Sequence, residues 1–181
     1  MSSAIGYTLF DTAIGRCALA WSARGLVCVM LPEATTEATV ARIRARHPDA
    51  VATDPPAAVE RAIGAMTALL NGVHTDLGFV ELDLGGHPEL HRRVWAITRG
   101  IPPGATLTYG EIARALGDPA LARAVGRALG RNPFPLVVPC HRVIGSAAAS
   151  GGFSAPGGVV TKMRLLDIER AVTGLTASLF D

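Results

Sequence analysis

Cysteine is scarce in this chain, and the residues present suggest neither disulfides nor a metal site. Cys17, Cys28 and Cys140 make an odd number, and no two of them stand in a C-x-x-C spacing. This pattern argues against a disulfide framework and against a cysteine zinc site. A reducing compartment is the simplest setting for such a chain, so we expect a cytoplasmic protein.

Long hydrophobic runs and a strong net charge are also missing. The apolar stretches end well before the roughly 20 residues that a membrane-spanning helix requires, and the opening "MSSAIGYTLF" lacks the pattern of an export signal. With 49% hydrophobic and 18% charged residues, the composition is that of a soluble globular protein. The net charge is only +2, so a polyanionic partner would have to be held by a local basic patch.

The first part of the chain predicts a small antiparallel sheet with helices. The runs "IGYTLFDT", "GRCALAWS" and "GLVCVMLP" are short, rich in β-formers and separated by glycine-containing turns, which favours a meander. Cys17, Leu19 and Trp21 alternate onto one face, so we interpret Cys17 and Cys28 as small core residues. "TTEATVARIRARH" and "PAAVERAIGAMTALLNG" predict two helices, and "DLGFVELDL" predicts one more strand.

The chain changes character around residues 85–87, where we place a domain boundary. Beyond it, Thr108 and Glu111 form the pattern of a capping box at the start of a short helix. Asp118-Pro119 then begins a second helix, so that two short helices flank a turn containing Gly117. This arrangement predicts a helix-turn-helix unit.

Arg123 and Arg127 lie four residues apart on the second helix of this unit, with small residues between them. A solvated helix face explains this pattern as well as a DNA-binding surface does. Small residues beside arginines also permit close approach to a phosphate backbone. The residues alone leave both interpretations open.

The segment "NPFPLVVPCHRVIGS" contains a cysteine and a histidine side by side, which suggests a catalytic site. Its apolar run, residues 136–138, is typical of a buried strand and leads into Cys140 and His141. A reactive cysteine needs a base, but neighbouring side chains on an extended segment point in opposite directions, so a turn or a bridging water is required. Glu169, near the end of the predicted C-terminal helix, could orient the imidazole. These residues predict a nucleophile with an adjacent base, a pairing that also occurs by chance.

The motif "PCHRV" at residues 139–143, with Asn132-Pro133 upstream, resembles the active-site motif of O6-alkylguanine-DNA alkyltransferases. The resemblance covers residues 88–170, where "TYGEIARAL", "ARAVGRALGRNP", "GGFSAPGG" and "TKMRLLDIE" also match in order. It implies an α+β fold. Residues 1–86 would form a small antiparallel sheet-plus-helix domain of ribonuclease H-like type, and residues 87–181 a mostly helical domain with the helix-turn-helix.

The same resemblance implies DNA repair by a single, irreversible transfer of an alkyl group, such as methyl, to Cys140. The group would come from O6 of guanine, or O4 of thymine, in duplex DNA. Deprotonation would run through a water to His141, held by Glu169. The implied contacts to the base are Tyr109 near N3, the backbone N–H of Ser154 at O6 and the carbonyl of Val143, while Asn132 braces the cysteine loop.

A damaged base must leave the stack before it can react. The resemblance implies that Arg123 inserts in its place, that Ala122 and Gly126 allow the helix into the minor groove, and that Arg127 and Arg131 contact phosphates. It further implies a monomer that needs no cofactor or metal, associated with the nucleoid in a bacterium. We accordingly interpret the histidines outside the motif as surface or capping residues: His47, His74, His87 and His91.

Two other functions fit part of the pattern. A thiol hydrolase or acyltransferase could use Cys140, His141 and Glu169, but it would turn over repeatedly and gives no reason for the helix-turn-helix. A DNA-binding regulator or lesion sensor without chemistry would explain that unit. Relatives of the sensing kind replace the acceptor cysteine, however, and Cys140 is intact.

Overall fold

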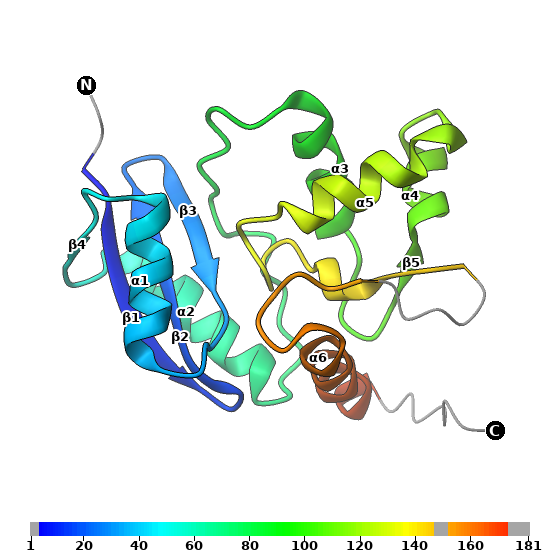
Figure 1. Cartoon of the computed structure of the whole chain (residues 1–181). Helices are drawn as coiled ribbons and strands as arrows, with labels where there is room; N and C mark the ends of the chain where they lie inside the picture. The colour runs from blue at the N-terminus through cyan, green and yellow to red at the C-terminus, as the bar shows by residue number, and fades with distance from the viewer. Residues whose placement is uncertain (1–3, 147–151, 174–181) are drawn as a thin grey trace.

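The computed structural model describes residues 4–146 and 152–173, which form an α+β fold (Figure 1). The N-terminal part contains a four-stranded sheet with the order β3-β2-β1-β4. The first three strands form the predicted antiparallel meander, and the short fourth strand runs parallel to β1. The strands are β1 (Gly6–Thr12), β2 (Gly15–Ser22), β3 (Gly25–Met30) and β4 (Val51–Ala52).

The two predicted N-terminal helices cover opposite faces of this sheet. Ala18 and Ala20 of β2 belong to the small cluster on the side of α1 (Thr36–Arg46), whereas Cys17, Leu19 and Trp21 face α2 (Ala57–Leu70). Cys17 and Cys28 are both fully buried. Their predicted role as small core residues is therefore confirmed.

The strand predicted for "DLGFVELDL" is wrong. This segment makes only an isolated parallel bridge between Leu82 and Leu26. The carboxylates of Asp76 and Asp83 accept hydrogen bonds from the backbone N–H groups of Gly78 and Gly85, at 2.8 and 3.1 Å. These local side-chain bonds favour turns at both ends of the segment and leave little length for a strand.

The C-terminal part is mostly helical and contains the predicted helix-turn-helix. The capping box of Thr108 and Glu111 is present at the start of α4, and Gly117 ends that helix with a positive φ of 97°. A one-turn 3₁₀ helix (Pro119–Leu121) then leads into α5, which packs against α4 and α3. The remaining elements are α3 (Glu89–Arg99), β5 (Leu107–Thr108), α4 (Tyr109–Ala115), α5 (Ala122–Gly130), a 3₁₀ turn (Cys140–Arg142), β6 (Val143–Ile144) and α6 (Gly158–Thr173).

One hydrophobic core joins the two parts. It contains the α2 side of the sheet together with Trp95, Phe134 and the buried faces of α3, α4 and α5. The indole N–H of Trp95 donates to the carbonyl oxygen of Ala128 at 3.0 Å, which ties α3 to α5. The boundary between residues 86 and 87 stays a prediction. No helix within residues 4–146 and 152–173 is long and apolar enough to cross a membrane.

Candidate active site

The segment that carries Cys140 is a series of turns, and the strand predicted at residues 136–138 is wrong. Leu136 is buried with a positive φ of 74°, which no strand contains. The amide of Asn132 holds this shape by donating to the carbonyl of Val138 at 2.8 Å and accepting from the N–H of Phe134 at 2.9 Å. Asn132 thus has the position expected of a residue that braces the cysteine loop.

Cys140 and His141 lie in the 3₁₀ turn that follows. This turn provides the change of direction that an extended chain would lack. His141 is buried, and its Nε2 lies 2.7 Å from Oε1 of Glu169 in α6. Nδ1, the other ring nitrogen, is also buried and has no hydrogen-bond partner among the described residues.

The protonation states of this pair follow from their surroundings. Burial lowers the pKa of His141 below its usual value, and this effect outweighs the opposing hydrogen bond to Glu169. Burial by itself would raise the pKa of Glu169, but hydrogen bonds from His141 and Arg142 lower it to about 2. At neutral pH the imidazole is therefore neutral and the carboxylate ionised. Nε2 then donates to Glu169, which leaves the lone pair on Nδ1 free to accept a proton.

Arg142 is a part of the site whose role the sequence analysis missed. Its buried guanidinium donates to Glu169, with Nη2 lying 2.8 Å from Oε1, and also to the carbonyl of Ile101 at 2.5 Å. The positive charge of the arginine therefore balances the negative charge of the ionised carboxylate, and its bond to Ile101 joins the cysteine loop to the segment that follows α3. Such a pair is costly to break from one side, because a buried charge is then left without a partner.

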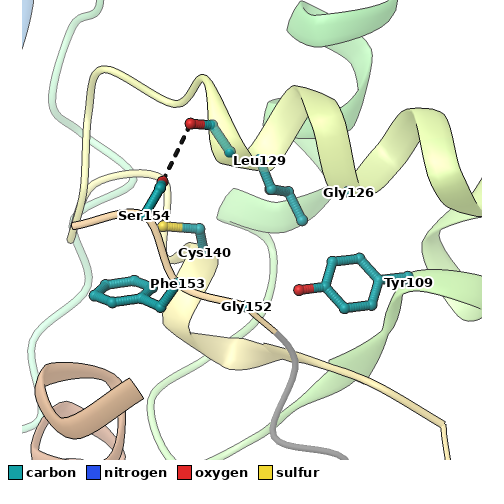
Figure 2. A pocket seen from close by; sticks show the side chains of 8 residues that line it. Tyr109, Gly126, Leu129, Cys140, Gly152, Phe153 and Ser154 are labelled. Atoms are coloured by element: carbon teal, nitrogen blue, oxygen red, sulfur yellow. Dashed lines mark hydrogen bonds between the residues drawn. The ribbon is translucent and has the colours of Figure 1, made fainter. Parts of the chain in front are cut away.

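Cys140 borders a cavity of about 400 Å³, a size typical of small-ligand sites. The hydroxyl of Tyr109 points into the cavity from one side, and Cys140, Phe153 and Ser154 lie on the other (Figure 2). The Ser154 hydroxyl donates to the carbonyl of Gly130 at 3.1 Å, which fixes the 152–157 segment against the end of α5. The residues that line the cavity are Tyr109, Gly126, Leu129, Gly130, Cys140, Gly152, Phe153 and Ser154.

Cys140 is partly accessible, unlike the other two cysteines. Burial raises the pKa of its thiol, while a hydrogen bond from Asn132 and the charge of Lys162 oppose that rise. Burial also raises the pKa of the Tyr109 phenol, with a further contribution from Cys140. The thiol and the phenol are thus both protonated at neutral pH, and Cys140 needs a base before it can act as a nucleophile.

Lys162 is a second residue that the sequence analysis missed. It is completely buried in α6, and its Nζ donates to the carbonyl of Val143 at 2.6 Å. Val143 itself is buried and does not border the cavity next to Cys140. The signal in the sequence was the spacing of Lys162, Leu165, Leu166 and Glu169, which places the lysine on the inward face of the helix.

The predicted DNA-contacting residues lie on and just after α5. Arg123, Arg127 and Arg131 are exposed, whereas Ala122 and Gly126 are partly covered. Gly126 also borders the cavity, so this helix links the arginine-bearing surface to Cys140. The geometry places these residues together, and their contacts to DNA remain predictions.

The predicted surface or capping role of the remaining histidines holds for His47, which caps the C-terminus of α1. It also holds for His74, which is exposed. His87 and His91 are half-buried, and both rings also pack against Trp95, with centroid distances of 5.0 and 5.7 Å. No cluster of three or more metal-binding side chains occurs in the described parts of the chain.

Comparison with known proteins decides the family. The family model for the 6-O-methylguanine DNA methyltransferase DNA-binding domain matches residues 89–171. The methylated-DNA–protein-cysteine methyltransferase of Mycobacterium tuberculosis is 37% identical over 177 residues, which cover 98% of this chain and 99% of that protein. This chain belongs to the methylated-DNA–protein-cysteine methyltransferase family. It is therefore a DNA-repair methyltransferase that transfers the alkyl group to a cysteine.

Further relatives of this methyltransferase agree in sequence and in fold. The protein from Methanothermobacter thermautotrophicus is 47% identical over 116 residues, a match that spans 64% of this chain and 63% of that relative. The crystal structure of Mycobacterium tuberculosis OGT in complex with DNA superposes with a TM-score of 0.74 at 36% identity, covering 92% of this chain and 94% of that one. The O6-methylguanine-DNA methyltransferase of Pyrococcus kodakaraensis gives 0.68 at 26% identity, with coverages of 91% and 98%.

Proposed function

We propose that Cys140 accepts the alkyl group from O6 of guanine, or O4 of thymine, in duplex DNA. One observation supports this assignment more than any other. His141 is buried with Nε2 bonded to Glu169 and Nδ1 left without a partner, directly beside a cysteine that borders a cavity. A water between Nδ1 and the sulfur would carry the thiol proton to the imidazole, and the ionised Glu169 would stabilise the imidazolium that forms.

The transfer itself is a displacement at a saturated carbon. The bond between the Cys140 sulfur and the alkyl carbon forms while the bond between that carbon and O6 breaks, and the electron pair leaves with the guanine. Guanine departs poorly as an anion, so donors that meet the developing charge accelerate the step. We assign Tyr109, whose hydroxyl points into the cavity, as the donor near N3, and the backbone N–H of Ser154 as the donor at O6.

A base in a stacked duplex cannot reach this cavity, so the target nucleotide must be flipped out. We propose that the side chain of Arg123 inserts into the base stack at the position that the flipped base has left. The partly covered Ala122 and Gly126 would let α5 approach the minor groove, and the exposed Arg127 and Arg131 would contact phosphates. The predicted contact of the base with the Val143 carbonyl would require this oxygen, which accepts from Lys162, to become open to the cavity, because Val143 is buried and does not border it.

The product is a thioether on Cys140. No group of the proposed site could expel a thiolate from saturated carbon, so each molecule acts once. We propose that the protein acts as a monomer, without a cofactor, in the cytoplasm or at the nucleoid of a bacterium. The requirement for a free thiol at Cys140 fits a reducing compartment.

The test is to incubate the protein with a duplex that contains O6-methylguanine and to weigh the intact protein. We expect a gain of one methyl group per molecule, located on Cys140 by peptide mapping, and no gain in Cys140→Ser. Cys17→Ser is the matched control, because Cys17 is buried in the core, and it should still gain one methyl group. Repeated turnover, or methylation of Cys140→Ser, would contradict the proposal.

A further inference from the structure

Arg142 and His141 bond to the same oxygen atom of Glu169. Nη2 of Arg142 lies 2.8 Å from Oε1, and Nε2 of His141 lies 2.7 Å from that oxygen. All three side chains are buried, with at most 6% of any of them exposed. A proton taken up by the imidazole would therefore create a second positive charge across one shared oxygen from the guanidinium, where solvent screens the repulsion only weakly.

The guanidinium of Arg142 is held in this place by further bonds. Its Nε lies 3.2 and 3.0 Å from the two carboxylate oxygens of Glu169, and its Nη1 donates to the carbonyl of Ile101 at 2.5 Å. An arginine does not lose its proton in a protein. The carboxylate thus faces a positive charge that is permanent and fixed in position.

The surroundings of His141 act on its basicity in opposite directions. Burial lowers the pKa of His141, Glu169 raises it through a hydrogen bond and a negative charge, and Arg142 and Lys162 lower it through their positive charges. Lys162 bonds to the carbonyl of Val143, whereas Arg142 bonds to the carboxylate itself. Arg142 is therefore the cation that directly opposes the effect of Glu169 on the imidazole.

We propose that Arg142 is a positioning residue that limits the basicity of the relay, so that Glu169 is ionised while His141 still lacks a proton when the substrate arrives. The inference rests on the proposed function, in which His141 accepts the thiol proton of Cys140. A buried carboxylate and imidazole without the guanidinium would take up a proton together at a higher pH. The relay would then hold that proton at neutral pH, and Nδ1 could not accept another.

The first test compares the alkylation rate constants of Arg142→Gln and the wild type on free O6-benzylguanine across a range of pH. The glutamine keeps a donor for Glu169 but removes the positive charge. Because an unopposed carboxylate raises the pKa of a neighbouring group by about one to three units, the deficit of the variant should shrink by about tenfold between about pH 6.5 and about pH 8.5. The ratio to the wild type removes any pH dependence that both proteins share.

Two further variants separate charge from structure. Arg142→Lys keeps the charge but loses the planar fork, so it should slow the reaction by a factor that stays constant within about 2-fold across this range. Arg99→Gln is the control for losing a half-buried guanidinium at the end of α3. It should lower the stability of the fold and leave the pH dependence of the rate unchanged. The Nη2 of Arg99 donates to the carbonyls of Leu77, Gly78 and Val80.

The second test follows the ring nitrogens of His141 by NMR in the unreacted protein. In the wild type we expect a neutral imidazole with its proton on Nε2 at pH 7, and in Arg142→Gln a titration midpoint at least about one unit higher. This measurement needs no activity. If Arg142→Gln did not fold, the wild type would still provide a test, because an imidazolium at pH 7 beside the bound guanidinium would overturn the proposal.

The outcomes also separate this inference from the proposed function. A deficit of Arg142→Gln that is equal at every pH would show that the arginine serves the fold alone, and the inference would fail. An unchanged titration midpoint of His141 in that variant would have the same consequence. A wild-type protein that takes up no methyl group from O6-methylguanine would instead contradict the proposed function, while the NMR titration, which uses no substrate, would be unaffected.

Discussion

His141 and Glu169 are 28 residues apart in the sequence, yet Nε2 of the histidine lies 2.7 Å from Oε1 of the glutamate. The contact joins the 3₁₀ turn that carries Cys140 to the C-terminal helix α6. Both side chains are buried, so solvent does not screen their interaction. The pair fixes which ring nitrogen carries the proton, and it leaves the other nitrogen, Nδ1, for the proton relay that we propose.

Replacing Glu169 with Gln should slow alkylation by about 100-fold or more, the usual contribution of a positioned acid–base group. The amide cannot stabilise the imidazolium, and it leaves Arg142 without its counter-ion. The free energy of unfolding should therefore fall by about 3–5 kcal/mol, as when one partner of a buried ion pair is removed. Single-turnover rates on duplex DNA and urea unfolding measure the two effects.

Asp167→Asn is the control for this change, because Asp167 is an exposed acid on the same helix. It should alter neither quantity appreciably. Binding of Glu169→Gln to undamaged DNA should persist, since α5 carries the proposed DNA-contacting arginines. An unchanged alkylation rate would remove Glu169 from the relay.

The reaction rate should depend on pH through His141. The base must be neutral to accept a proton, and burial lowers the pKa of His141 below its ordinary 6.5. The rate on free O6-benzylguanine should therefore keep its neutral-pH value as the pH falls to 6.5 and decline only below it. The free base avoids any effect of pH on DNA binding. A decline centred above pH 6.5 would contradict a neutral, buried His141.

Much of the fold could be predicted because its signals are local. The capping box of Thr108 and Glu111 lies within one helical turn, and the alternation of Cys17, Leu19 and Trp21 along β2 records which face is buried. Such patterns depend only on residues that are close in the sequence, so they can be recognised without knowledge of the tertiary structure.

The turn at residues 136–138 could not be predicted in the same way. An apolar run indicates that a segment is buried but does not specify its backbone conformation. This run is bent by the two hydrogen bonds that the side chain of Asn132 makes with the backbone of Phe134 and Val138. The ion pair of Arg142 with Glu169 joins residues that are distant in the sequence, so no local pattern specifies it. The buried position of Lys162 could in principle have been predicted from the sequence, because a lysine on the inward face of a helix conflicts with the apolar pattern around it.

Arg123→Ala should lower the alkylation rate on duplex DNA by about tenfold or more, while the rate with free O6-benzylguanine should stay within about 2-fold of the wild-type rate. The two substrates differ because a few kcal/mol of unstacking must be offset only in the duplex. The arginine is exposed and does not border the cavity, so its loss does not alter the chemistry. Arg61→Ala, at an exposed position on α2, provides the control and should affect neither substrate. Equal losses on both substrates would exclude the role of Arg123 in base extrusion.

Gly126→Ala should stabilise the fold while it slows repair. A Cβ atom at this position would lie 3.9 Å from the ring of Tyr109, an ordinary contact, so the helix accepts it without strain. Replacing glycine inside a helix typically adds about 0.5–1 kcal/mol to the free energy of unfolding. Gly64→Ala in α2 is the matched control, because nothing lies within 4 Å of its Cβ, and it should bring the same gain without a change in rate.

The added methyl group of Gly126→Ala occupies space where the cavity meets the face of α5 that is expected to approach DNA. The rate on duplex DNA should therefore fall in Gly126→Ala and fall further in Gly126→Leu, whose side chain fills more of the cavity. Thermal unfolding and single-turnover rates on the same preparations separate stability from repair. If Gly126→Leu folded and reacted at the wild-type rate, the extruded base could not occupy the space between Tyr109 and Cys140.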